Sequence, residues 1–108
     1  MFFYYIMNNI IEAFKNSSIE IKHLLETDLS IKSITNIQNE SGDIVKKLDL
    51  EANKIFHKNL NECNAIYKYI TEEDKEETLV NENGIYYVSV DPLDGSSNIE
   101  NNNIVGNI

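Results

Sequence analysis

Apolar residues recur at helical spacing in two stretches of the chain. The first stretch runs from Asn9 to about Glu26, with apolar residues three or four positions apart along one stripe. Its apolar positions are Ile10, Phe14, Ile21, Leu24 and Leu25, and Ser17 occupies one place of the stripe. The pattern predicts an amphipathic helix that buries this stripe, followed by a loop from Asp28 to Asn39, where no period is clear.

The second stretch begins at Ser41-Gly42-Asp43, a combination typical of a helix start. Ser41 or Asp43 is suited to cap the first turn, because a short oxygen-bearing side chain accepts hydrogen bonds from N–H groups that lack a helical partner. The predicted helix continues to about Leu60. Its apolar side consists of Ile44, Leu48, Ala52, Ile55 and Phe56.

Two strands are predicted after the helices. Residues 65–71 alternate Ile66, Lys68 and Ile70 on one side with Tyr67 and Tyr69 on the other. Residues 85–90 are rich in Tyr and Val, and Asn83-Gly84 marks a turn just before them. Another apolar run begins at 103–108. The order of helix, helix, strand and strand predicts an α+β or layered α/β fold with helices on a sheet.

Composition narrows the possible functions. With 108 residues the chain forms one domain at most, and its 18 acidic and 9 basic residues give a formal charge of -9. A nucleic-acid binder needs a basic face, so this class is excluded. The apolar run from Met1 to Met7 is far too short to span a bilayer. Cys63 is the only cysteine, which indicates a reducing, cytoplasmic setting.

Acidic residues follow both predicted strands. Glu72 and Glu73 come after the first strand, and Asp91 and Asp94 come after the second. Ligands of layered sheets bind beyond the carboxyl ends of the strands, so neighbouring strands would bring these carboxylates into one small volume. Because ionised carboxylates repel one another and offer only oxygen donors, they indicate a hard divalent cation, Mg²⁺ with Mn²⁺ as a possible substitute.

The residues around Asp94 suit an anion. Pro92 fixes the backbone after Asp91, which would turn the Leu93 carbonyl toward the same ion as Asp94. After Gly95, the N–H and hydroxyl groups of Ser96 and Ser97 suit a phosphate. Metal ligands followed directly by an anion cradle indicate metal-assisted transfer of a phosphoryl group to water.

Simpler interpretations exist for several of these residues. Taken alone, residues 72–77 would be a solvated charged loop, and residues 91–95 would be a polar turn. The order of two Asp, one Pro, one Gly and two Ser directly after a strand is rarer than an ordinary polar turn. It therefore favours a role in metal and phosphate binding for residues 91–95, and with them for residues 72–77. His23 and His57 lack metal-site spacing and are interpreted as surface or packing residues. Cys63 is interpreted as a small buried apolar residue.

Several blocks together resemble the N-terminal part of class 1 fructose-1,6-bisphosphatases. They are Ser41-Gly42-Asp43, Lys46-Lys47-Leu48-Asp49, Ala52-Asn53, Glu72-Glu73-Asp74-Lys75, Asp91-Pro92-Leu93-Asp94-Gly95-Ser96-Ser97-Asn98-Ile99 and Val105-Gly106. Inositol monophosphatases share a similar Asp-Pro-Ile-Asp-Gly-Thr pattern and are more distant. Sedoheptulose-1,7-bisphosphatase is the closest alternative, and it usually differs at Asn98.

The resemblance implies roles for individual residues. Glu72, Asp91, the Leu93 carbonyl and Asp94 would hold magnesium, with Asp43 as a further metal-associated acid. Asp49 and Glu73 would orient and deprotonate the attacking water. The substrate phosphate would face Asp94, Gly95, Ser96, Ser97 and Asn98. The assignment of Asp43 and Asp49 to the site rests on the resemblance alone, because by themselves they are ordinary acidic residues at a helix start.

The implied activity is hydrolysis of fructose 1,6-bisphosphate to fructose 6-phosphate and phosphate in gluconeogenesis or carbon fixation. The implied fold is the layered α/β sandwich of the sugar phosphatases, and full-length members commonly form homotetramers. The match covers about the first third of a family member, so residues 1–108 are expected to be part of the N-terminal domain, without the C-terminal domain. A truncated, non-catalytic fragment is the alternative to an enzyme.

Overall fold

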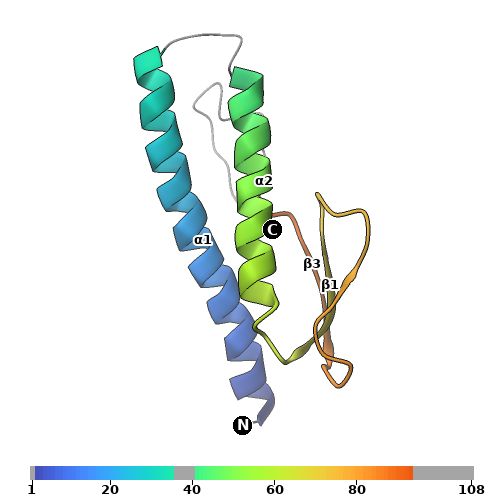
Figure 1. Cartoon of the computed structure of the whole chain (residues 1–108). Helices are drawn as coiled ribbons and strands as arrows, with labels where there is room; N and C mark the ends of the chain where they lie inside the picture. Colours follow the sequence, from blue (N-terminus) through green and yellow to red (C-terminus); the bar gives the residue numbers. More distant parts are fainter. Residues whose placement is uncertain (1, 36–40, 94–108) are drawn as a thin grey trace.

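The computed structural model describes residues 2–35 and 41–93, with side chains for 7–27 and 46–93. Its elements are α1 (Phe2–Thr35), α2 (Ser41–Leu60), β1 (Ile66–Thr71), β2 (Thr78–Leu79) and β3 (Tyr86–Val90). The helices run antiparallel, side by side, and the sheet lies against α2 (Figure 1). The predicted order of two helices followed by strands in an α+β fold is confirmed. No helix in the described ranges is long and apolar enough to cross a membrane.

The first helix is longer than its apolar period predicts. The predicted loop from Asp28 is wrong for its first part, because α1 continues to Thr35, and at the other end α1 begins at Phe2. Neither Gly nor Pro occurs between these ends. Once a helix is nucleated, each further residue adds a hydrogen bond at little cost, so a weak period does not by itself end it.

The second helix has the predicted bounds and supplies most of the core. Leu48, Ala52, Phe56 and Leu60 are all 0% exposed, which makes a continuous buried stripe at four-residue spacing. The ring of Phe56 meets that of Phe14 on α1 edge to face, with the centroids 5.2 Å apart. Ile55 packs against this core, as its place on the predicted apolar side suggested.

The sheet has the order β2-β1-β3. β1 and β3 are parallel neighbours, and their last residues, Thr71 and Val90, lie opposite each other. β2 pairs antiparallel with the other edge of β1. The sequence pattern did not predict β2, because two residues are too few to establish an alternation.

The predicted alternation along β1 is wrong. Ile66 pairs with Tyr86 and Lys68 pairs with Tyr87, the next residue of β3. β1 therefore has one extra residue at this point, which is a β-bulge. Ile66 and Tyr69 are therefore both fully buried, although they are three positions apart. Beside the bulge lies Gly84 of the predicted turn, where an added Cβ would come within 2.4 Å of the Ile66 carbonyl carbon.

Candidate functional site

The two acidic segments meet at one edge of the sheet. Thr71 pairs with Val90 at the carboxyl ends of β1 and β3, so Glu72 and Asp91 follow directly from paired residues. The Glu72 N–H donates a hydrogen bond of 3.0 Å to the Val90 carbonyl oxygen, which extends the pairing past the strands. The structure therefore brings Glu72 and Asp91 to neighbouring positions of the backbone.

A cleft of about 500 Å³ opens at this edge. Its lining in the described part of the chain comes from both strand ends and consists of Ile70, Thr71, Glu72, Asp74, Ser89, Val90 and Asp91. The volume is within the range of small-molecule sites. The cleft therefore lies where the two acidic segments meet.

Glu72 and Glu73 occupy the two corner positions of a tight turn. The Asp74 N–H donates to the Thr71 carbonyl oxygen at 3.1 Å, and the Thr71 N–H donates to Asp74 Oδ2 at 3.2 Å. Thr71 is 2% exposed, whereas both glutamates are exposed. The residues at the ends of the turn are thus fixed, and those at its corners are exposed.

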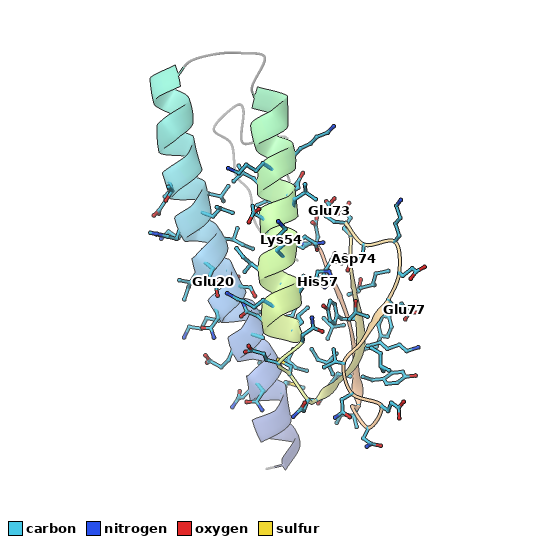
Figure 2. All side chains as sticks on the ribbon, viewed as in Figure 1. Glu20, Lys54, His57, Glu73, Asp74 and Glu77 are labelled. Carbon is cyan, nitrogen blue, oxygen red and sulfur yellow. The ribbon has the colours of Figure 1, made fainter. Side chains whose placement is uncertain are left out.

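Asp74 is held from α2 as well. Asn53 Nδ2 donates to Asp74 Oδ1 at 3.1 Å, and His57 Nε2 lies 2.8 Å from the same oxygen. Figure 2 shows His57 on α2 beside Asp74. Burial by itself would raise the pKa of Asp74, but the hydrogen bonds from His57, Asn53 and the Thr71 N–H outweigh it and hold the pKa below its usual range.

Asp49 lies on α2 one turn before Asn53 and acts on Glu73. Partial burial of Glu73, together with the negative charges of Asp49, Asp91 and Asp74, raises the pKa of Glu73 above its usual range. The carboxylates predicted to handle water, Asp49 and Glu73, are therefore close enough to influence each other.

The segment after β3 is anchored by its apolar residues. Pro92 and Leu93 are buried, and the Leu93 N–H donates to Asp91 Oδ1 at 3.3 Å. This local hydrogen bond fixes the Asp91 carboxylate at the start of the turn. The other predicted ligands are less fully described: Asp43 lies in the first turn of α2 without a described side chain, and Asp94, Gly95, Ser96, Ser97 and Asn98 lie outside the described residues.

The described acids at the cleft do not by themselves make up a metal site, but their chemistry suits one. Within residues 2–35 and 41–93, no three Asp, Glu, His or Cys side chains come together as a ligand group. The acids that line the cleft, Glu72, Asp74 and Asp91, offer only oxygen donors, which suit a hard divalent cation. The donor chemistry therefore fits magnesium, with Asp94 as a further candidate ligand.

Sequence reasoning did not identify the groups that hold the turn. It interpreted His57 only as a surface or packing residue, and it gave Asn53 and Asp74 no role beyond the family pattern. A signal was available in the four-residue spacing of Asp49, Asn53 and His57, each one position after a buried residue of α2. Cys63 is buried, as predicted.

Comparison with known proteins identifies the family. Residues 2–108 match the family model described as fructose-1-6-bisphosphatase, N-terminal domain. A class 1 fructose-1,6-bisphosphatase from Campylobacter hominis is 34% identical over 98 residues, covering 90% of this chain and 35% of the relative. One from Colwellia psychrerythraea is 42% identical over 71 residues, covering 66% of this chain and 22% of the relative.

A solved structure supports the same family assignment. The crystal structure of Leishmania major fructose-1,6-bisphosphatase in holo form superposes with a TM-score of 0.76 at 27% identity, covering 95% of this chain and 31% of that protein. The chain thus spans about a fifth to a third of the length of the proteins it matches. The chain belongs to the class 1 fructose-1,6-bisphosphatase family, and its match lies in the family's N-terminal domain.

Proposed function

We propose that these residues form part of a magnesium-dependent site that hydrolyses fructose 1,6-bisphosphate to fructose 6-phosphate and phosphate. The observation that carries the proposal is the meeting of the Glu72-Glu73 turn and Asp91 at adjacent strand ends, around a cleft lined by both segments. Family membership supports the reaction class, a phosphoric monoester hydrolysis in carbohydrate metabolism.

Magnesium would be held by oxygen ligands from both segments. We assign Glu72, Asp91, the Leu93 carbonyl and Asp94 as its ligands, and Asp43 as a further acid associated with it. When bound, the ion supplies positive charge that polarises the phosphoryl group and offsets the negative charge of substrate and carboxylates. Asp91 suits this role because its turn is anchored by the buried Pro92 and Leu93.

Asp49 and Glu73 would act on the attacking water. One carboxylate orients the water by accepting a hydrogen bond, and the other accepts its proton as the new P–O bond forms. The raised pKa of Glu73 supports it as the acceptor, because it binds a proton more readily than an ordinary carboxylate. Asp49 contributes to that pKa from the facing helix.

The phosphate would lie against residues 94–98. The N–H and hydroxyl groups of Ser96 and Ser97 are donors suited to phosphate oxygens, Gly95 allows close approach of the backbone, and Asn98 adds an amide donor. Because this order continues directly from Asp91, the phosphate would be next to the carboxylates that act on water.

The test uses a hybrid protein in which this chain replaces the matching segment of the Campylobacter hominis relative. We expect the hybrid to release phosphate from fructose 1,6-bisphosphate with magnesium and to stop when the metal is chelated. Asp94→Asn should abolish release, whereas Glu82→Gln, a change at an exposed acid outside the cleft lining described above, should not. Unimpaired turnover by the Asp94→Asn hybrid would sink the proposal, and faster release from sedoheptulose 1,7-bisphosphate would reassign the substrate.

A further inference from the structure

One face of α2 carries polar residues at four-residue spacing beside the buried stripe. Asp49, Asn53 and His57 each follow a core residue by one position, so they form a second stripe, turned by about 100° around the helix axis from the first. Asp49 affects the pKa of Glu73, while Asn53 and His57 both contact Asp74. The whole stripe therefore faces the turn that carries Glu72 and Glu73.

The position of that turn depends on its two end residues. Glu72 and Glu73 are exposed and project from a turn that Thr71 and Asp74 close by reciprocal hydrogen bonds. Thr71 is fixed in β1, but Asp74 lies beyond the strand. The Asp74 side chain is nevertheless only 13% exposed, and besides the Thr71 N–H it is contacted by Asn53 and His57 of α2.

His57 is itself held rigidly. Its Nδ1 shares a hydrogen bond with the hydroxyl of Tyr69, a fully buried residue of β1, and the two rings meet edge to face with centroids 5.1 Å apart. Because a carboxylate oxygen only accepts, the contact of 2.8 Å between Nε2 and Asp74 Oδ1 requires an N–H on Nε2. Tyr69, His57 and Asp74 thus form a continuous link from the sheet core through α2 to the end of the turn.

We propose that His57 is a positioning residue for this site, acting through Asp74 to keep the Glu72-Glu73 turn directed at the cleft and at Asp49. The importance of His57 for catalysis rests on the proposed function. His57 is not assigned a contact with the substrate, the metal or water. Replacing His57 leaves every carboxylate of the site in place, so any change in activity would come from the altered geometry of the turn.

The first test measures hydrogen exchange in the 108-residue chain. His57→Leu should make the Glu72 and Asp74 amides exchange about ten-fold faster, because a hydrogen bond to a charged group is lost from the turn. His57→Gln, which keeps an N–H donor, should retain most of the protection. His23→Leu, the same change at an exposed position of α1, should leave it unchanged. Unprotected turn amides in the unmodified chain, or equal protection in His57→Leu, would overturn the inference.

The second test measures turnover by the hybrid protein. His57→Leu should lower kcat about ten-fold or more while KM for fructose 1,6-bisphosphate changes less, and His57→Gln should restore most of the rate. Unchanged kcat in His57→Leu would overturn the positioning role. A hybrid with no activity in any form would count against the proposed function instead, and hydrogen exchange, which needs no turnover, would still decide the role of His57.

Discussion

The side-chain amide of Asn53 joins the two ends of the Glu72-Glu73 turn, so Asn53→Ala is an informative perturbation. Its Nδ2 donates to Asp74, and its Oδ1 accepts from the hydroxyl of Thr71 at 2.5 Å. The bond to the Asp74 carboxylate is worth roughly 1.5–3 kcal/mol and the bond from the neutral hydroxyl about 0.5–1.5 kcal/mol. Alanine is the better helix former by at most about 0.7 kcal/mol. We therefore expect a net loss of about 2–3 kcal/mol in the free energy of unfolding.

Equilibrium urea unfolding of the 108-residue chain measures this loss. With a slope of roughly 1–3 kcal/mol per molar urea, the midpoint should fall by about 1–2 M. Asn16→Ala, on the exposed side of α1, is the matched control and should change stability little. Asn53→Asp keeps the acceptor for Thr71 but sets a second carboxylate against Asp74, so it should cost more at neutral pH than at acid pH. A loss for Asn53→Ala below about 0.5 kcal/mol, as at an ordinary surface position, would refute the reasoning.

Three further predictions concern stability. Phe56→Ala should cost about 3–5 kcal/mol in urea unfolding, because the ring is fully buried against Phe14, and a loss below about 1 kcal/mol would contradict this packing. The pKa of Asp74 is lowered in the folded state, so ionised Asp74 adds to the free energy of unfolding above the ordinary carboxyl pKa, and this contribution is lost as the pH falls through the lowered value. The urea midpoints of the unmodified chain and of Asp74→Asn should therefore converge in acid. Because partial burial and the charges of the neighbouring acids raise the pKa of Glu73, its ionised form opposes folding, so Glu73→Gln should increase stability at neutral pH by about a few tenths of a kcal/mol, and a lower midpoint would contradict this.

The helices and the site were predictable from sequence to different degrees. The bounds of α2 followed from its start signal and its apolar stripe, since both are local features. The end of α1 did not, because the period weakens before the helix ends at Thr35. The bulge in β1 depends on pairing with β3 and on the close approach of Gly84, so the prediction that Tyr67 and Tyr69 share one side of the strand was wrong.

For the site, the order of acids after the strands predicted that Glu72 and Asp91 would meet if the strands were neighbours, and the parallel pairing of β1 and β3 supplies that condition. The role of Asp74 could not be obtained in the same way. Its partners Asn53 and His57 are 21 and 17 positions away, and only the packing of α2 on the sheet brings them together. Long-range polar contacts of this kind leave little trace in a single sequence.

Phosphate release from fructose 1,6-bisphosphate by the Glu73→Gln hybrid tests the central claim most directly. Glu76→Gln, at an exposed acid of the same loop, is the control. If Glu73 accepts the proton of the attacking water at a magnesium site, Glu73→Gln should lower kcat by roughly 100-fold or more while Glu76→Gln retains full activity. Equal magnesium-dependent turnover by the two variants would contradict the account.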